Sequence, residues 1–314
     1  NLRYFIILAP AITATLMTLT GIMPNYTALT LLFFAVGVTI ASFHAPAPAM
    51  IARISGRQVG KGMSIFMAGG ELARTVGPLM AVWAITTWGV EGMWRVAVLG
   101  WAISALLYLR LRSIPAQVGP RPGLRAMLPA ARRIFVPLVV VIIFRGFLQV
   151  ALSIYLPTFM QAGGSGFWAS AGALSILELA GVAGALVSGP LSDRLGRKPV
   201  LAGAFGGAAA LTLVFLAVSG WLRIPLLLGM GLSLLSTQPV LMAIVQDQLP
   251  EHRAVANGFF MTILFAVQLV ATLLIGAVGD EFGLQAAFFG SAVAMFFAIP
   301  AVLWLPAMPL QGEG

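Results

Sequence analysis

The sequence predicts an all-α, polytopic membrane protein, and three observations lead to this prediction. Of the 314 residues, 60% are hydrophobic and only 9% are charged, whereas about a quarter of the residues of a soluble protein are charged. Apolar stretches of about 20 residues recur along the chain, and each can cross the ~30 Å hydrocarbon core of a bilayer as a helix. Most of the basic residues lie in alternate loops between these stretches. Because backbone groups in lipid have no other partners, the stretches must be helices.

Ten apolar spans follow one another along the chain. We place them at roughly 4–22, 27–52, 62–87, 94–110, 134–160, 167–190, 199–218, 224–248, 255–279 and 284–306.

The basic residues orient these spans. Fourteen Lys and Arg residues lie before the first span or after the second, fourth, sixth and eighth spans, and only Arg95 and Arg223 lie in the alternate connections. The first group of connections is therefore predicted to be cytoplasmic, and so are both ends of the chain. The net charge of +9 is thus explained by membrane topology, and we expect no nucleic-acid partner because no basic stripe is interleaved with aromatic residues.

A proline-rich segment, Ser113 to Pro129, divides the first four spans from the last six. Such a stretch is typical of a linker. We expect an incomplete four-helix bundle over 1–112, a cytoplasmic linker over 113–133 and a six-helix bundle over 134–314.

An internal repeat relates the two groups of spans. The heptapeptide WGVEGMW, which starts at Trp88, resembles FGLQAAF, which starts 194 residues later at Phe282. Gly62 and Gly258 open matching spans with an offset of 196. Carried back to the beginning, the repeat places Arg3 opposite about Arg197. We therefore expect that two helices precede Asn1 in the complete protein, and the alternative is a natural ten-helix protein.

The segment Gly189 to Leu201, GPLSDRLGRKPVL, is the most distinctive connection. We expect Gly189 and Pro190 to end one helix and Gly196 to allow a tight reversal. Asp193 can accept hydrogen bonds from Arg197 or from a helix N-terminus. The bases of the segment can hold it at the anionic inner leaflet; they are Arg194, Arg197 and Lys198.

Polar residues inside the spans are candidates for a transport cavity, because ionisable groups at membrane depth usually face water or one another. Glu71 and Arg74 share one helix face, and they form either a packing pair or part of a transport site. Arg145 can hold an anion bidentately, and Gln149 follows one turn later. Glu178 either carries a proton or pairs with Arg145. The remaining candidates are His44, Gln238 and Gln268, of which His44 is more often a packing residue.

The sequence contains no catalytic constellation. There is no cysteine, and His44 and His252 lack the spacing of metal ligands. No phosphate-binding loop of the GxxxxGK[ST] form occurs, so ATP is not the direct driver. We expect neither enzymatic activity, nor a cofactor, nor a bound metal.

The charged segment 189–201 resembles the loop between helices two and three in each half of a major facilitator superfamily transporter. The stretch from Ser42 to Leu79, SFHAPAPAMIARISGRQVGKGMSIFMAGGELARTVGPL, resembles the fosmidomycin-resistance branch, as does 243–280. This resemblance implies two pseudo-symmetric six-helix halves, with the present spans as helices three to twelve, in a bacterial-type inner membrane. It also implies that the charged segment is a cytoplasmic gate and that the protein works as a monomer.

The resemblance implies proton-driven efflux of a small drug-like or anionic compound by alternating access. Gly77-Pro78 is similar to an antiporter motif but lacks the trailing glycines, so proton-linked uptake of a metabolite remains an alternative. A third possibility is an inactive membrane fragment or scaffold. By position, His44, Arg145, Gln149 and Gln238 would face the cavity, and Glu71, Glu178 and Gln268 would lie on helices that pack between the halves.

Overall fold

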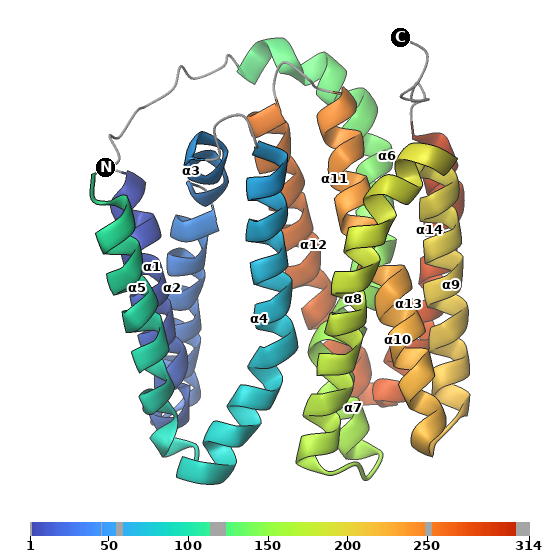
Figure 1. Cartoon of the computed structure of the whole chain (residues 1–314). Coiled ribbons are helices and arrows are strands. Elements are labelled where there is room, and N and C mark those ends of the chain that lie inside the picture. Colours follow the sequence, from blue (N-terminus) through green and yellow to red (C-terminus); the bar gives the residue numbers. More distant parts are fainter. Residues whose placement is uncertain (1, 45, 55–58, 114–123, 249–252, 306–314) are drawn as a thin grey trace. The chain divides into compact units, whose positions relative to one another are not determined.

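A computed structural model of the chain describes residues 2–44, 46–54, 59–113, 124–248 and 253–305. All regular structure in these ranges is helical (Figure 1). The all-α prediction is therefore confirmed. The chain divides into two compact units, of which the first comprises Asn1–Gly70 with Leu79–Arg121 and the second comprises Glu71–Pro78 with Pro122–Gly314.

The first unit is built on close packing of its first and last helices. Gly100 lies so close to Ala14 and to the carbonyl of Pro10 that a Cβ atom would not fit. The indole Nε1 of Trp101 donates to Oγ1 of Thr15 at 2.9 Å. The helices of this unit are α1 (Leu2–Thr18), η1 (Leu19–Ile22), α2 (Tyr26–His44), α3 (Ala47–Ile54), α4 (Val59–Trp88, of which 71–78 group with the second unit), η3 (Glu91–Val96) and α5 (Ala97–Leu111).

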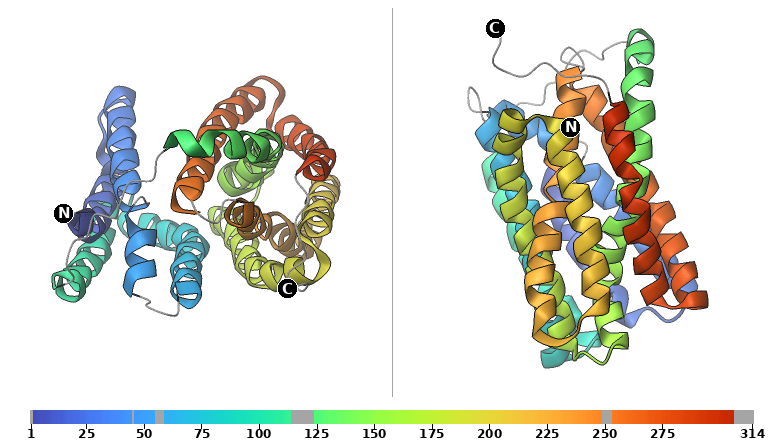
Figure 2. Two further views of the ribbon diagram at one scale, coloured as in Figure 1. Left: turned by 90° about the horizontal axis from the view of Figure 1, so that it is seen from above. Right: turned by 90° about the vertical axis from the view of Figure 1, so that its right-hand side faces the viewer.

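The second unit has the larger core. Its helices are α6 (Leu124–Val150), η4 (Ala151–Tyr155), α7 (Leu156–Ala162), α8 (Phe167–Leu195), α9 (Arg197–Ala217), η5 (Gly220–Leu222), α10 (Arg223–Leu234), α11 (Thr237–Gln248), α12 (Arg253–Phe282), α13 (Leu284–Phe296) and α14 (Ala298–Trp304). Seen along the helix axes, neighbouring helices of this unit lie side by side (Figure 2). Four phenylalanines are fully buried between them, namely Phe205, Phe215, Phe260 and Phe288.

Helices α8 and α10 pack most intimately. A Cβ atom added at Gly231 would collide with the carbonyl of Leu177, and one added at Gly184 would collide with the backbone of Leu232. Small residues allow this approach, as at many helix interfaces in membranes. Leu177 immediately precedes Glu178, so the contact fixes the part of α8 that carries the buried acid.

Nine helical segments of the described residues are long and apolar enough to cross a membrane. They correspond to nine of the ten predicted spans. The remaining predicted span, 62–87, lies within α4, whose 30 residues correspond to about 45 Å of helix at 1.5 Å per residue.

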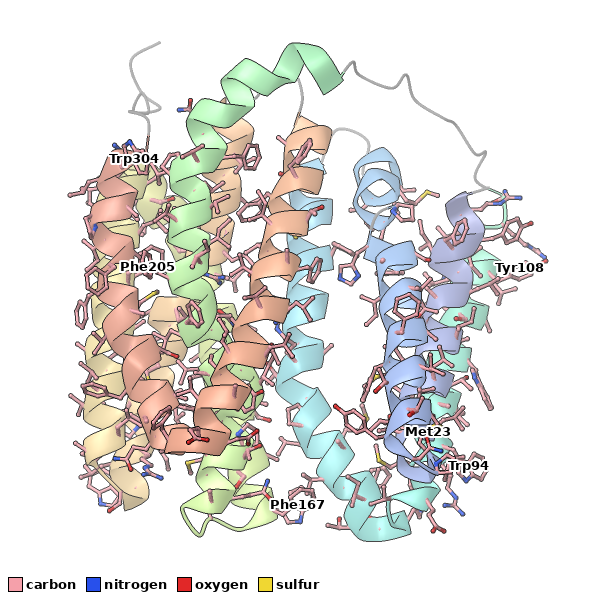
Figure 3. All side chains as sticks on the ribbon, turned by 180° about the vertical axis from the view of Figure 1, so that it is seen from behind. Met23, Trp94, Tyr108, Phe167, Phe205 and Trp304 are labelled. Atoms are coloured by element: carbon pink, nitrogen blue, oxygen red, sulfur yellow. The ribbon has the colours of Figure 1, made fainter. Side chains whose placement is uncertain are left out.

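Many large apolar side chains are exposed on the surfaces of both units, among them Phe34, Trp101, Leu269 and Leu273. In the first unit, Met23 and Trp94 lie at one end and Tyr108 lies toward the other (Figure 3). In the second unit, Phe167 and Trp304 lie at opposite ends (Figure 3). Exposed apolar surface between end-placed aromatic residues is typical of a lipid-facing surface.

Several predicted spans are interrupted helices. The predicted span 27–52 is divided into α2 and α3, and Pro46, just before α3, has no N–H to donate to a continuous helix. Helix α6 begins at Leu124, inside the segment that we expected to be a linker. The backbone there continues as a helix through Pro129, which removes one hydrogen bond without ending the helix.

The internal repeat is visible in the secondary structure. Helices α4 and α12 are both 30 residues long, and α12 begins and ends 194 residues after α4. Each is followed by a glycine with positive φ, Gly89 at 71° and Gly283 at 82°. The repeated sequence at Trp88 and Phe282 therefore marks the same helix end in both copies.

Candidate functional site

Arg145 is the most deeply buried cation of the described residues. It lies in α6 with 2% of its surface exposed. Its Nε donates to Oγ1 of Thr237 at 2.7 Å, and its Nη2 donates to Oε1 of Gln149 at 3.1 Å. Among the described residues, no carboxylate lies within 4.0 Å of its guanidinium group. Its partners are neutral, so no described residue gives its positive charge a direct counter-charge.

A line of hydrogen bonds leads from Arg145 to Glu178. The amide Nε2 of Gln149 donates to Oγ of Ser153 at 2.7 Å. The Ser153 hydroxyl donates to Oε1 of Glu178 at 2.9 Å. Glu178 lies in α8 and is 1% exposed.

The line ends at an ion-paired group on α4. Arg74 Nε donates to Oε2 of Glu178 at 3.2 Å, and Arg74 Nη2 pairs with Oε2 of Glu71. The Arg74 side chain is 51% exposed and that of Glu71 is 20% exposed, so the line runs from a buried cation to a more accessible ion pair. Glu71 and Arg74 share one helix face, as the sequence predicts.

The site contains two acids and two bases, and its formal charge is balanced. Arg145 is also close enough to Arg74 and Glu71 to interact with both electrostatically. Glu178 pairs with Arg74 rather than with Arg145, which corrects one of the two roles expected for it. Among the described residues, it is joined to Arg145 through Ser153 and Gln149. Such an arrangement can accept a proton on Glu178 and present Arg145 to an anion.

The other predicted residues make none of the hydrogen bonds described for this line. His44, in the first unit, places Nδ1 3.1 Å from the carbonyl of Ile40 within its own helix. Neither the Gln238 nor the Gln268 side chain makes a hydrogen bond to another described residue, although the Gln268 carbonyl accepts from Thr272 at 2.8 Å. The structure therefore brings together Arg145, Gln149, Glu178, Glu71 and Arg74, and it leaves His44, Gln238 and Gln268 outside the hydrogen-bonded line.

The sequence analysis did not identify Ser153, which belongs to the line, or Thr237, which accepts a hydrogen bond from Arg145. Ser153 lies four residues after Gln149 and eight after Arg145, a spacing that places it near the same helix face. Thr237 directly precedes Gln238, but it is Thr237 that faces Arg145. The hydroxyl of Ser175, one turn before Glu178, is buried and has no partner among the described residues.

The charged segment 189–201 forms a tight helix-to-helix reversal. Helix α8 continues through Gly189 and Pro190 to Leu195, so these two residues do not end the helix, contrary to the prediction. A proline near the end of a long helix costs one backbone hydrogen bond and is tolerated in this position. The reversal is made by Gly196, at φ 89° and ψ 147°, which only glycine adopts readily.

Two polar contacts hold this reversal. Arg197 Nη2 lies 3.6 Å from Oδ1 of Asp193, as expected, whereas Arg194 is exposed. Lys198 Nζ donates to the carbonyl of Leu303 in α14 at 3.1 Å. In the first unit, Arg3 Nη1 donates to the carbonyl of Arg112 at 2.8 Å. In both units, a base near the start of one helix thus binds a carbonyl near the end of the unit's last helix.

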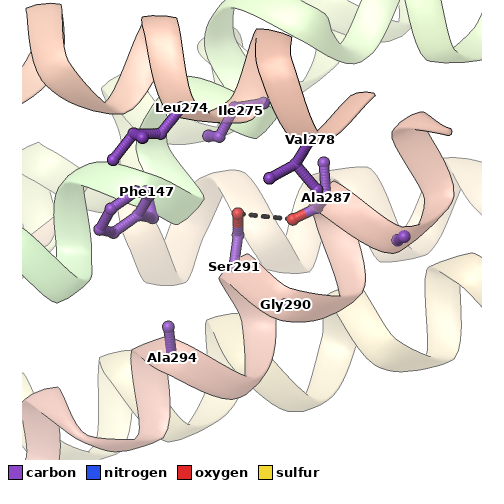
Figure 4. Close-up of a pocket in the computed structure, with 9 residues that line it drawn as sticks. Phe147, Leu274, Ile275, Val278, Ala287, Gly290, Ser291 and Ala294 are labelled. Atoms are coloured by element: carbon purple, nitrogen blue, oxygen red, sulfur yellow. Dashed lines mark hydrogen bonds between the residues drawn. The ribbon is translucent and has the colours of Figure 1, made fainter. Parts of the chain in front are cut away.

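An apolar pocket lies between α6, α12 and α13 (Figure 4). Its one hydroxyl, on Ser291, donates to the carbonyl of Ala287 in its own helix at 2.7 Å. Phe147 lines the pocket two residues after Arg145, and successive positions in a helix differ by about 100°. The pocket therefore lies on a different face of α6 from the polar line. Within the described ranges, no group of three or more His, Asp or Glu side chains could hold a metal ion.

Comparison with known proteins identifies the family. The sequence pattern of the Major Facilitator Superfamily matches residues 2–271. The chain belongs to the major facilitator superfamily. Members of this superfamily are membrane transporters rather than enzymes, so the chain is a secondary transporter, and the predicted resemblance is confirmed.

Two curated relatives agree with this assignment. The chain is 26% identical over 279 residues to the fosmidomycin resistance protein of Escherichia coli (strain K12), covering 86% of this chain and 68% of that protein. It is 24% identical over 294 residues to YfnC, an uncharacterized MFS-type transporter of Bacillus subtilis (strain 168), covering 87% and 70%.

Solved structures show the same fold. A crystal structure of the E. coli fucose:proton symporter FucP matches 98% of this chain and 84% of the symporter, with a TM-score of 0.66 and 15% sequence identity. A second structure of FucP, in the outward conformation, matches with a TM-score of 0.62 and 16% identity. The major facilitator fold predicted from the sequence is therefore confirmed.

Proposed function

We propose that this major facilitator protein is a proton-coupled secondary transporter that exports a small drug-like or anionic compound by alternating access. The observation that carries the proposal is the continuous hydrogen-bonded line from Arg145 to Glu178 and Arg74. Ionisable groups at membrane depth are costly, and they mark substrate and proton pathways in transporters. A line that joins a buried acid to a buried base couples two charges in one site.

The two ends of the line suit different roles. The described partners of Arg145 are neutral, so an anionic group of the substrate can supply its counter-charge through a bidentate contact. Glu178 is buried, and a carboxyl group in such a place can carry a proton across the membrane in its neutral form. We assign substrate contact to Arg145 and Gln149, and proton transfer to Glu178 with Arg74 and Glu71 as its charged partners.

Efflux is supported by the E. coli relative, which is named as a fosmidomycin resistance protein. Proton exchange requires that the proton and the compound exclude each other from the site. Within this charge arrangement, exclusion is strongest for a cationic or neutral compound that competes with the proton for Glu178. An efflux role in exchange for protons thus favours compounds that are not strongly anionic.

Proton-linked uptake of a small anion is the second candidate, and the charge balance favours it. With Glu178 neutral, the four ionisable residues of the line carry a net charge of +1, and an anion then binds better. A proton and an anion that favour each other's binding travel together. Arg145, with no carboxylate close by in the described structure, fits this role equally well.

The charged segment 189–201 is assigned as a gate on the cytoplasmic side. Its ion pair between Asp193 and Arg197 and the Lys198 contact with α14 support this, because they join helices that must move during alternating access. The surplus of bases on alternate connections supports cytoplasmic termini in a bacterial-type inner membrane. We expect a monomer to be the working form.

Flux measurements in proteoliposomes test the proposal. Vesicles that contain the protein are prepared at about pH 8 and diluted into buffer at about pH 6, with fosmidomycin, benzoate as an anion and ethidium as a cation as probes. Proton exchange accelerates the exit of a preloaded probe, whereas proton-linked uptake accelerates the entry of an external one. Absence of gradient-dependent movement in either direction, for all three probes, would favour an inactive scaffold instead.

A further inference from the structure

Gln149 and Ser153 link Arg145 to Glu178 by hydrogen bonds, and all three of Arg145, Gln149 and Ser153 lie along one helix. Arg145 and Gln149 lie in α6, and Ser153 lies in the five-residue π-helical turn η4. In a regular α-helix a residue eight positions later lies about 80° further around the axis. A π turn has more residues per turn and rotates the chain less per residue. The turn therefore keeps Ser153 in line with Gln149 and within 2.9 Å of Glu178.

The two ends fix the direction of every hydrogen bond in this connection. A guanidinium group has only donors and an ionised carboxylate has only acceptors. Gln149 must therefore turn its oxygen to Arg145 and its NH₂ group to Ser153. Ser153, which accepts from Gln149, must give its only proton to Glu178. All donors point from the base to the acid, and hydrogen bonds aligned in this way strengthen one another.

We propose that Gln149 and Ser153 are positioning residues that transmit the protonation state of Glu178 to Arg145. The inference rests on the proposed function only in that Glu178 gains a proton and Arg145 meets an anion. Because the proton then favours binding of the anion, the inference deepens the second candidate, proton-linked uptake. With Glu178 ionised, Nη2 of Arg145 remains hydrogen-bonded to Oε1 of Gln149. With Glu178 neutral, Gln149 releases Nη2 to an anion.

The proton balance of this step can be followed atom by atom. Oε2 of Glu178 accepts from the charged Arg74, so an added proton goes to Oε1. The new O–H group and the Ser153 O–H group cannot both donate to each other. Glu178 then donates to Ser153, Ser153 turns its hydrogen toward Gln149, and the Gln149 amide turns over to accept it. The Gln149 NH₂ group now faces Arg145, and their hydrogen bond is lost.

Among the described side chains, few other charges act on Glu178. Arg74 contacts it, and Glu71 and Arg145 lie beyond. The elements packed against α8 are α7, α9, α10, α11 and η4. Their titratable side chains have other partners: Arg197 pairs with Asp193, Lys198 binds the carbonyl of Leu303, Arg223 donates to the carbonyl of Val218, and the Tyr155 hydroxyl donates to the carbonyl of Thr272.

Sulfate binding to the protein in nanodiscs tests this inference, because the charge of sulfate does not change between about pH 5 and about pH 8. In the wild type we expect its affinity to rise about tenfold as the pH falls through this range, a typical size for coupling between two sites. In Ser153→Ala the change should be less than about twofold, at the higher affinity. Gln149→Met, which keeps the chain length, should behave in the same way and serves if the alanine variant does not fold.

The controls separate the relay from a general effect of structure. Ser153→Thr keeps the hydroxyl and should retain the wild-type pH dependence. Ser170→Ala should also retain it, because the Ser170 hydroxyl donates to the carbonyl of Gly166, the residue just before its own helix. Glu178→Gln should bind sulfate tightly at every pH, and Arg145→Gln should lose binding.

Two results would overturn the inference. A Ser153→Ala protein with the wild-type pH dependence would show that the charge of Glu178 acts through space. A pH dependence that persists in Glu178→Gln would place the proton elsewhere. If the coupling is lost only in the relay variants while proteoliposomes show no proton-driven flux, the relay stands and the proposed transport function fails.

Discussion

Arg74 Nε lies 3.2 Å from Oε2 of Glu178, a residue 104 positions later in the chain. The Ser153 hydroxyl donates a hydrogen bond to the other carboxylate oxygen, Oε1, at 2.9 Å. Both contacts are made to a carboxylate whose side chain is 1% exposed, and charge-assisted hydrogen bonds offset part of the cost of burying a charge. A proton that enters this site must disturb one of them, so protonation changes the arrangement of Ser153 in η4 or of Arg74 in α4.

Glu178→Gln should therefore uncouple transport from the pH gradient. The amide cannot gain or lose a proton, so accumulation driven by the gradient should disappear. Exchange of internal for external substrate, which needs no net proton movement, should continue at a comparable rate. Both rates can be measured in the same proteoliposomes with a labelled substrate.

Glu281→Gln is the matched control for this change. Glu281 is exposed near the end of α12 and contacts no member of the polar line, so its variant should accumulate substrate as the wild type does. Gradient-driven accumulation that survives in Glu178→Gln would rule out Glu178 as the proton carrier.

Thr237→Val should weaken substrate binding by about tenfold, since a hydrogen bond to a charged group contributes about 1.5–3 kcal/mol and 1.4 kcal/mol corresponds to tenfold. Valine removes the acceptor that holds Nε of Arg145, so the guanidinium group loses its fixed orientation. The expected signature is a higher KM with a smaller change in maximal rate.

Thr262→Val provides the comparison for Thr237. The Thr262 hydroxyl donates to the carbonyl of Gly258 in its own helix at 2.9 Å, so its loss should leave KM unchanged. Equal effects of the two substitutions on KM would show that Thr237 has no special part in orienting Arg145.

The sequence was sufficient to predict what depends on local pattern. Apolar length predicts the spans, the three-residue spacing of Glu71 and Arg74 predicts their shared face, and the repeat at Trp88 and Phe282 predicts two related helix ends. Each of these follows from helix periodicity or from bilayer thickness, which act over a few turns of chain.

Pairing across the fold could not be predicted in this way. The partner of Glu178 is set by how α4 and α8 are placed, and a carboxylate can pair equally well with Arg74 or Arg145 on composition alone. The choice of Thr237 over Gln238 depends on which side of α11 faces α6. The continuation of α8 through Pro190 shows that proline is a weak signal for the end of a membrane-spanning helix.

Gly231→Ala should destabilise the second unit by about 1–3 kcal/mol, the usual cost of adding atoms to a packed interface. The new Cβ atom would meet the carbonyl of Leu177 and Cβ of Ala180, so α8 and α10 must separate. Thermal unfolding of the purified protein in detergent measures the loss. Gly172→Ala, also in α8 but with open space at its Cβ position, should be neutral or slightly stabilising. Equal unfolding temperatures for the two variants would contradict close contact at Gly231.

Gly196→Ala should destabilise the protein and slow transport, because the reversal between α8 and α9 needs a backbone conformation of φ 89° and ψ 147°. An alanine in a sparsely populated region of this kind costs about 1–3 kcal/mol. Relief of the strain would move Arg197 away from Asp193 and disturb the charged segment. Gly203→Ala, seven residues later in α9 with open space around its Cβ position, should have little effect, since its helical backbone accepts alanine. The unfolding temperature and the initial transport rate of both variants measure the difference, and a Gly196→Ala protein that matches the Gly203→Ala protein in both would show that the reversal does not depend on glycine.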